Sequence, residues 1–572
     1  MFRLALFGVA VGLAVLTIRA VASPWWLLVP VALFIPLLQR HDRVIRARRD
    51  AARLISFYDR GLARIEDRWA GTGETGDRFR QDEHLYADDL DLFGDASLFQ
   101  LLSQARTRAG EEALAAWLKH PAAAETIQRR HVAIDELRGA LDLREALSLA
   151  GTEIRAGVHP DELLAWTTSP GVVAGTSRRL LIIAMTVALP TLLALAWVGS
   201  SMTLVIVAAL ARLVYQHIDG ERIEAALRHA DTAAHELDVL RPALDRLERE
   251  AFVSAPLRDL QDTLRRDGRR AGTAIRTLGR YAEMHDWTHN IVFMPIAAVL
   301  MWDSHVSWAV ERWRAANGVH VAEWLRVVGE FEALSSLAAY AYEHPDDPFP
   351  RIAVGRAAAD IPPVFIAQAL GHPLLPSSQM VRNDLCLDAS TRLIVVSGSN
   401  MSGKSTFLRS VGINAVLALA GAPVRAASLT VSVVTPGATL RIQDSLQQGR
   451  SRFFAEITRI RQLADLSRSS PVLFLLDELF HGTNSHDRLV GATGVLKDLL
   501  DRGAIGLITT HDLALTAITR DLGARATNMH FEDSFDGIDL HFDYRIKPGP
   551  VTRSNAIALM RAVGLDVREN PS

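Results

Sequence analysis

The stretch that decides the fold of this chain is Gly398-Ser399-Asn400-Met401-Ser402-Gly403-Lys404-Ser405-Thr406. It fits the pattern G-x-x-x-x-G-K-[ST], in which a glycine-rich loop cradles phosphate groups. The apolar residues 393–397 before it predict a buried strand, and residues 407–419 after it predict a helix. A strand, a loop and a helix N-terminus in this order form an anion site, because free backbone N–H groups and the helix dipole point at the phosphate. The stretch therefore predicts nucleotide binding in an α/β domain.

A second motif lies further along the chain, where the apolar residues 471–476 predict a strand that ends in Asp477 and Glu478. Phosphoryl-transfer chemistry uses such a pair, because one carboxylate holds Mg²⁺ and the other orients the attacking water as general base. We assign Asp477 to Mg²⁺ through water, with the Ser405 hydroxyl as direct ligand. Lys404 is then the residue at the β- and γ-phosphates of ATP, and Glu478 is the base. The alternative is a strand that merely ends in a solvated acid pair.

A third strand, predicted over residues 506–510, ends immediately before His511. A histidine at this position can sense the γ-phosphate, so we assign His511 to the catalytic set with Glu478 and Lys404. The alternative is an ordinary histidine at a strand end.

Composition narrows the function classes. The 572 residues contain 62 basic and 65 acidic side chains, a net charge of −3, so no overall basic field indicates nucleic-acid binding. A single cysteine, Cys386, excludes a disulfide framework and a cysteine zinc site.

Four apolar runs predict two transmembrane helical hairpins, formed by residues 4–18 with 25–38 and by residues 180–198 with 202–211. Each run is near or below the ~20 residues that a spanning helix needs. Two alternatives stay open: a signal peptide, although no A-x-A-like site follows the first run, and buried core hairpins of a soluble protein. The shorter apolar run 291–302 predicts a core helix rather than a span.

Arginines flank both hairpins on one side, at Arg40, Arg43, Arg46, Arg48, Arg49, Arg178, Arg179 and Arg212. By the positive-inside rule, both hairpins enter and leave on the cytoplasmic side. This predicts a multi-pass protein of the cytoplasmic (inner or plasma) membrane with its ATP site in the cytosol.

Four motifs in order resemble the ATPase domain of the MutS family of DNA mismatch-repair proteins. They are the loop 398–406, the run Gly-Arg-Ser-Arg-Phe-Phe-Ala-Glu at 449–456, Asp477-Glu478 followed by Gly482-Thr483, and Thr510-His511. Upstream, residues 92–110 and 330–338 are similar to segments of that family's helical core and levers. The resemblance covers most of residues 86–560, and it is strongest to a short, membrane-anchored branch of MutS-related proteins.

The resemblance implies an ABC-type ATPase that works as a homodimer with its nucleotides between the protomers. It assigns Ser451 to the γ-phosphate of the partner's ATP, Asn400 to the phosphates of its own ATP, and His511 to a switch role. Ser451 also has the spacing of a helix N-cap in a capping box with its following residues, and the two roles are compatible.

The predicted fold is an α/β P-loop (ABC-type) ATPase domain preceded by an all-α core and lever domain, with two inserted transmembrane hairpins. The expected boundaries are 1–40 for the first hairpin, 41–177 for the first part of the core, 178–215 for the second hairpin, 216–350 for the second part of the core and levers, and 351–572 for the ATPase domain.

Mismatch reading is not expected by the family's usual route. That route uses an N-terminal domain with a Phe-x-Glu wedge, and the only such triplet here, Phe454-Ala455-Glu456, lies within the ATPase motifs. DNA contact is still a candidate through Arg265, Arg266, Arg269, Arg270, Arg276 and Arg280, which could neutralise several phosphates. The alternatives are a solvated helix face or one that faces anionic lipid headgroups.

Together these features predict a membrane-anchored, Mg²⁺-dependent, MutS-like ATPase that moves helical levers, with DNA as a candidate ligand. The alternatives are an ABC-class transport ATPase, which would need an LSGGQ-like signature, and an ATP-driven membrane scaffold with a protein or lipid partner.

Overall fold

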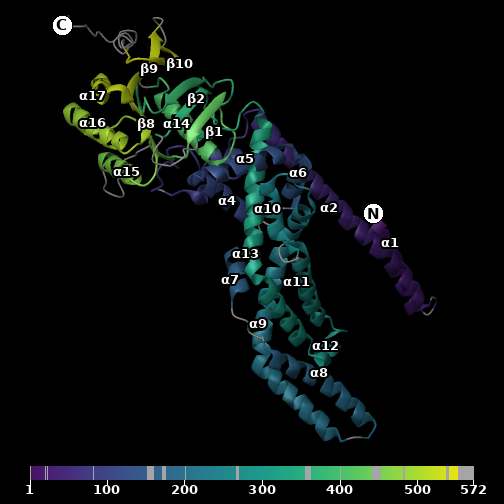
Figure 1. Cartoon of the computed structure of the whole chain (residues 1–572). Helices are drawn as coiled ribbons and strands as arrows, with labels where there is room; N and C mark the ends of the chain where they lie inside the picture. The colour runs from purple at the N-terminus through teal and green to yellow at the C-terminus, as the bar shows by residue number, and fades with distance from the viewer. Residues whose placement is uncertain are drawn as a thin grey trace, which may run out of the picture. The chain divides into compact units, whose positions relative to one another are not determined.

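The computed structural model describes residues 2–19, 21, 23–81, 83–150, 160–169, 175–199, 201–265, 270–353, 362–399, 401–440, 452–480, 483–535 and 540–551. The chain divides into two compact units, Met1–Ala63 and Arg64–Ser572. The predicted order of a helical region followed by an α/β domain is confirmed (Figure 1).

The first unit consists of helix α1 (Phe2–Ile18), a short 3-10 turn (Pro24–Leu27) and most of helix α2 (Leu28–Ile65). Large apolar side chains such as Phe7, Trp25 and Leu33 are exposed on it. Helix α2 continues through residue 40 without a break, so the boundary expected there falls inside a single helix.

Eleven helices are described in the helical part of the second unit: α3 (Leu98–Leu102), α4 (Arg108–Lys119), α5 (Ala124–Gly139), α6 (Leu141–Ala150), α7 (Pro160–Thr168), α8 (Thr176–Trp197), α9 (Met202–Arg249), α10 (Ala255–Leu264), α11 (Ala271–Asp286), α12 (Met294–Leu300) and α13 (Trp302–Glu343). The long helix α13 packs against α4, α5, α9 and α11. Residues 331–341 of α13 are buried all around the helix, as expected for the central helix of a core.

Polar contacts fasten α4 to this central helix. Glu332 accepts hydrogen bonds from the backbone N–H of Thr107 (3.0 Å) and from its hydroxyl (2.6 Å). The same Thr107 hydroxyl caps α4 by accepting a bond from Gly110 N at 2.9 Å. Each buried polar group is thereby satisfied, which is the condition for placing it in a core.

The strands form two sheets: β1 (Arg351–Ala353), β2 (Phe365–Leu370), β3 (Asn383–Leu387) and β5 (Ser428–Ser432) in the smaller, and β4 (Leu393–Ser397), β6 (Thr435–Thr439), β7 (Val472–Leu476), β8 (Ile505–Thr510), β9 (Ala526–Phe535) and β10 (Leu540–Pro548) in the larger. The larger sheet has the order β10-β9-β4-β8-β7-β6. All its strands are parallel except β10, which pairs antiparallel with β9 at one edge.

Alternate side chains of the larger sheet pack into two different cores. Ile394 and Val396 of β4 pack with helix α14 (Lys404–Ala420) and with the helical part of the chain. Leu393 and Val395 pack on the other face, with helices α15 (Arg452–Leu466), α16 (Ser485–Asp501) and α17 (Ile518–Leu522). Because a parallel sheet covered on both faces is open only at its ends, the carboxyl ends of β4, β7 and β8 define the place for a ligand.

Within the described residues, two helices are long and apolar enough to cross a membrane, Ser177–Trp197 and Met202–Arg249, and Leu6–Ile18 is a shorter apolar helix. The side chains of Ser177–Trp197 are almost entirely unburied, which contradicts the alternative of a buried core hairpin for residues 180–211. The prediction of a core helix over residues 291–302 is also wrong. Helix α12 is shorter, and its Met294 and Ile296 are exposed.

Candidate active site

The loop between β4 and α14 depends on two glycines with positive φ. Gly398 has φ 153°, and a Cβ there would lie 2.9 Å from the backbone oxygen of Phe531. Gly403 caps α14 with φ 97°, and its Cβ would lie 3.0 Å from the Tyr544 ring. The loop thus approaches its neighbours as closely as backbone allows, and the first N–H groups of α14 have no partner within the helix. This is the arrangement of an anion site.

Lys404, the first residue of α14, folds back over this loop. Its Nζ donates hydrogen bonds to the backbone oxygens of Gly398 (2.8 Å) and Ser399 (2.6 Å). Burial lowers the pKa of Lys404, and the nearby carboxylates of Glu478 and Asp477 oppose that shift. A buried ammonium group at a loop of N–H donors is a second attraction for an anion.

Asp477 follows β7 and is held by two hydroxyl groups. Ser405 Oγ donates to Asp477 Oδ2 at 2.6 Å, and the Thr509 hydroxyl, at the end of β8, donates to Oδ1. A hydroxyl and a carboxylate side by side are the hard oxygen donors that Mg²⁺ prefers. Among the described residues no three His, Cys, Asp or Glu side chains gather into a metal cluster. The Ser405–Asp477 pair therefore fits an ion that takes its remaining ligands from phosphate and water.

Glu478 lies next to this pair and faces His511. Its backbone has a left-handed conformation, with φ 50°, and its N–H donates to the Thr509 hydroxyl at 3.0 Å. Its Oε1 lies 3.2 Å from Nδ1 of His511. Both side chains remain partly exposed, at 23% and 39%. A carboxylate fixed by a histidine and still open to water has the geometry of a general base.

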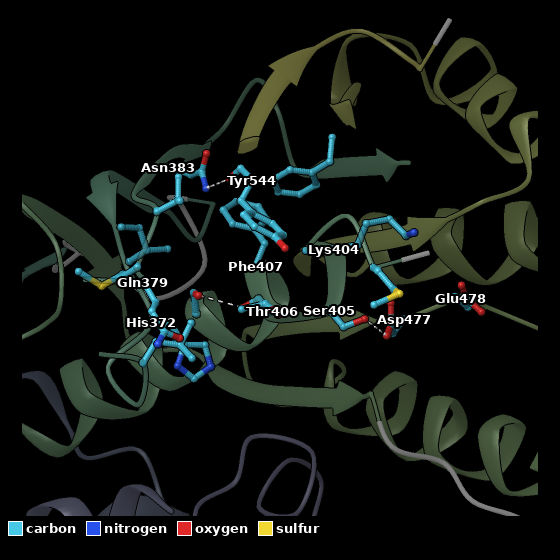
Figure 2. Close-up of a pocket in the computed structure, with 18 residues that line it drawn as sticks. His372, Gln379, Asn383, Lys404, Ser405, Thr406, Phe407, Asp477, Glu478 and Tyr544 are labelled. Carbon is cyan, nitrogen blue, oxygen red and sulfur yellow. Dashed lines mark hydrogen bonds between the residues drawn. The ribbon is translucent and has the colours of Figure 1, made fainter. Parts of the chain in front are cut away.

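A cavity of about 700 Å³ extends from these residues (Figure 2). On the side opposite Asp477 and Glu478 it is lined by His372, Gln379 and Asn383. The full lining comprises Leu370, His372, Leu375, Gln379, Met380, Val381, Asn383, Met401, Gly403, Lys404, Ser405, Thr406, Phe407, Ser410, Asp477, Glu478, Phe531 and Tyr544. The half close to the loop is polar, and the opposite half combines its three polar residues with apolar and aromatic side chains such as Leu375, Met380 and Tyr544.

Sequence reasoning missed the half of the cavity opposite the loop. Tyr544 lies where the pairing of β10 with β9 shifts register, with φ 52°. Asn383 stabilises this irregular turn, because its Nδ2 donates to Tyr544 O (3.0 Å) and its Oδ1 accepts from Ile546 N (2.8 Å). Tyr544 and Asn383 lie far apart in the chain and carry no local motif, so no spacing pattern could have found them.

His372 is the titratable group buried at the far wall of the cavity. Its Nδ1 accepts a hydrogen bond from Leu374 N at 3.2 Å, which requires the neutral ring. Burial lowers the pKa of His372 to about 4. The ring is therefore uncharged at neutral pH.

The structure brings most predicted site residues together. Met401, Gly403, Lys404, Ser405, Thr406, Asp477 and Glu478 line one cavity, Gly398, Ser399 and Ser402 form the loop beside it, and His511 contacts Glu478. The Ser402 side chain is buried. Asn400 and Ser451 lie outside the described residues.

The arginines predicted for DNA are only partly available. Arg265 donates to the backbone oxygen of Glu248, and Arg276 pairs with Asp245 at 3.1 Å, so both are tied to α9. Arg270 and Arg280 are exposed. Arg266 and Arg269 lie outside the described residues.

Asp89, in the helical part of the unit, joins three segments around the site. Its Oδ1 accepts from Leu440 N after β6 (2.7 Å), and its Oδ2 lies 3.4 Å from Arg459 of α15. Its backbone oxygen accepts from Arg409 of α14 at 3.2 Å. This single residue thus connects the helix after the glycine-rich loop with the helix that follows Ser451.

Comparison with known proteins agrees with this geometry. Residues 394–568 match the family described as MutS domain V. The α/β part of this chain is therefore similar to MutS domain V. A segment of 203 residues is 36% identical to the DNA mismatch repair protein MutS 2 of Haloarcula marismortui. That alignment covers 34% of this chain and 21% of the relative, so the chain spans about a fifth of the length of this curated relative. MutS domain V is an ATPase domain, and the loop, Asp477 and Glu478 lie within the matched residues.

Proposed function

We propose that this protein is a MutS-like ATPase that binds ATP in the cavity above the carboxyl ends of β4, β7 and β8 and hydrolyses it to ADP and phosphate. The observation that carries the proposal is the convergence of Lys404, Ser405, Asp477 and Glu478 on one cavity. Its polar half accommodates the phosphates, and its opposite half, with Tyr544, accommodates the base.

Each residue then has a separate task. The N–H groups at the start of α14 and the Lys404 ammonium bind the β- and γ-phosphate oxygens. Ser405 and Asp477 would hold Mg²⁺, which neutralises charge on the phosphate oxygens when bound. Glu478 orients the attacking water and accepts its proton, and His511 positions the Glu478 carboxylate through the 3.2 Å contact. Lys404 must leave the carbonyls of the loop to reach a phosphate.

The decisive test is the Glu478→Gln variant of the full chain, solubilised in detergent. We expect ATP binding close to wild type and a hydrolysis rate reduced by about 10²–10⁴-fold, the usual contribution of a general base. Glu532→Gln is the matched control, because it makes the same chemical change on an exposed side chain of β9. Hydrolysis at the wild-type rate by Glu478→Gln would remove Glu478 as the base.

We also propose that the active form is a homodimer in which Ser451 completes the partner's site. The resemblance of residues 449–456 to the MutS signature supports this, as does the exposed position of the neighbouring Phe454. Mixing Glu478→Gln protomers with Ser451→Ala protomers tests it. One composite site in such a heterodimer carries both defects and the other carries neither, so activity should be restored relative to each variant alone. No restoration would contradict a shared site.

DNA is the ligand that we propose for the helical part, on the ground that the curated relative is a DNA mismatch repair protein. The exposed Arg270 and Arg280 offer sequence-independent phosphate contacts. Binding should therefore weaken with salt, with a log–log slope of about −0.9 per phosphate contact. The ATPase rate with homoduplex, mismatched and branched DNA across a salt series tests this. A rate and binding signal unchanged by every DNA at low salt would leave a protein or lipid partner instead.

Finally, we propose that the apolar helices anchor the protein in the cytoplasmic membrane with the ATPase in the cytosol. Support comes from the unburied apolar surface of α8 and from Arg178 and Arg179, which precede its apolar run. Topology reporters fused after residue 199 and at the C-terminus test it. We expect the first to report the far side and the second the cytosol.

A further inference from the structure

Residues 287–300, within the connection between α11 and α13, carry an exposed apolar surface. Ile291 and Val292 are 83% and 81% exposed, and Met294 and Ile296 of α12 are exposed by half. Single exposed apolar residues are common on soluble proteins. A contiguous run of them marks a surface that contacts something apolar.

This segment lies against the apolar hairpin of α8 and α9. Helix α12 packs on α8, and the Thr186 hydroxyl lies 3.5 Å from the backbone oxygen of Leu300. Figure 1 shows α12 beside the α8–α9 hairpin. The exposed face of the segment is therefore continuous with that of α8, where Leu181 and Val187 are exposed.

A buried arginine completes the end of α12. Arg212 of α9 is 6% exposed, and its guanidinium donates to the backbone oxygens of Val299 (2.8 Å) and Ala298. The last carbonyls of a helix have no partner within the helix. In water they would be solvated, whereas in hydrocarbon each one left unpaired is costly. Arg212 donates hydrogen bonds to these carbonyls from within the apolar hairpin. Intramembrane charged side chains pair in this way with backbone carbonyls.

The depth of the segment follows from its neighbours on α8. Thr186 lies six residues beyond Leu180, where the apolar run of α8 begins, which is about 9 Å along a helix. Interfacial helices bury their apolar face by about 5–10 Å. Trp287, which begins the segment, stacks with Trp302, the first residue of α13, with ring centres 6.1 Å apart. Tryptophan favours the membrane–water boundary.

We propose that residues 287–300 form a third membrane element, which inserts into the leaflet nearest the helical core without crossing it, beside the α8–α9 hairpin. The exposed apolar face of the segment contacts lipid, and Arg212 holds the segment in position. The inference rests on the proposed membrane anchoring, and it adds a contact between the bilayer and the start of α13, the central helix of the core.

Three valines provide a matched test in the full-length protein reconstituted into phosphatidylcholine–phosphatidylglycerol nanodiscs. In a Cys386→Ser background, single cysteines replace Val292 in the segment, Val187 in α8 or Val253 in the helical core. Val253 and Val292 are equally exposed, at 81%. Each cysteine carries an environment-sensitive fluorophore, and nitroxide-labelled lipids quench it.

We expect quenching at Val292 to approach that at Val187 and to exceed that at Val253 several-fold. Quenching at Val187 alone would overturn the inference and leave the hairpin as anchor. Quenching at Val292 without Val187 would overturn it too, because the segment would then not lie beside an inserted hairpin. Quenching at neither site would remove both. Adding Arg212→Leu should reduce quenching at Val292 by at least half and leave Val187 unchanged. An unchanged Val292 signal would remove the role of Arg212.

Discussion

Ser405 and Asp477 are joined by a 2.6 Å hydrogen bond between Ser405 Oγ and Asp477 Oδ2. The bond places the two proposed Mg²⁺ ligands in contact before any nucleotide is bound. Because the other Asp477 oxygen is held by Thr509, the carboxylate has little freedom to rotate. The site is thus arranged in advance for an ion that prefers fixed oxygen ligands.

Removing the hydroxyl of Ser405 should change the Mg²⁺ requirement. A hydrogen bond or ligand contact to a charged group contributes about 1.5–3 kcal/mol. Ser405→Ala should therefore raise the Mg²⁺ concentration for half-maximal hydrolysis by at least about tenfold. Thr509→Val removes the other hydroxyl at Asp477 and should lower the rate with little change in that concentration. An identical Mg²⁺ titration for Ser405→Ala and wild type would contradict the assignment.

The buried Lys404 ammonium should lower the stability of the folded state and increase the affinity for ATP. Its pKa is lowered by burial, so the unfolded state holds this proton to higher pH than the folded state does. The contribution of Lys404 to stability therefore rises with pH between its lowered pKa in the folded state and its ordinary pKa of 10.5. At neutral pH, Lys404→Met should keep or raise the urea midpoint and reduce ATP affinity at least about tenfold. Lys497→Met, on the exposed face of α16, is the control and should change neither. A lower midpoint for Lys404→Met would show that the ammonium stabilises the loop.

His372 should make the α/β part sensitive to mild acid. The folded state keeps this ring neutral down to a pKa of about 4, whereas its unfolded value is 6.5. As pH falls from 7.5 to 5 the unfolded state gains a proton that the folded state does not, which costs about 2 kcal/mol of stability. His372→Asn keeps an acceptor for Leu374 N and does not titrate. Its urea unfolding curve should shift less between these pH values than that of wild type. Equal shifts would place the ring in contact with solvent.

Asp89 should stabilise the contact between the helical part and the ATPase helices. Asp89→Ala leaves Leu440 N without its acceptor and should cost about 1–3 kcal/mol. Asp89→Asn retains that acceptor and loses only the charge opposite Arg459, so it should cost less. Asp88→Ala is the control, because Asp88 is adjacent in sequence and its side chain is 44% exposed. Denaturation midpoints measure all three, and an equal effect of Asp88→Ala and Asp89→Ala would contradict the link.

Local motifs explain what could be predicted from the sequence. The strand at 393–397, the loop after it and the acids after β7 are each contained in a few adjacent residues, and the structure has strands β4 and β7 at the expected positions. Contacts between distant segments could not be predicted. Asn383 supports Tyr544, and Asp89 contacts Leu440, only because the chain folds back on itself.

The core helix predicted over residues 291–302 is the helical prediction that failed. The run 291–302 is apolar, but its composition cannot tell a buried helix from one with an exposed apolar face. Burial is a property of the neighbours, and the neighbours of α12 are known only from the fold.

Helix α9 is 48 residues long, about 72 Å at 1.5 Å per residue. It begins at the tip of the apolar hairpin and ends in the core next to α10. No loop separates these two regions, so tilting one end of this rod must displace the other. In the proposed membrane, a change in bilayer thickness or curvature around the hairpin would therefore displace the end of α9 in the helical core. The core would respond to the bilayer mechanically, without any diffusible messenger.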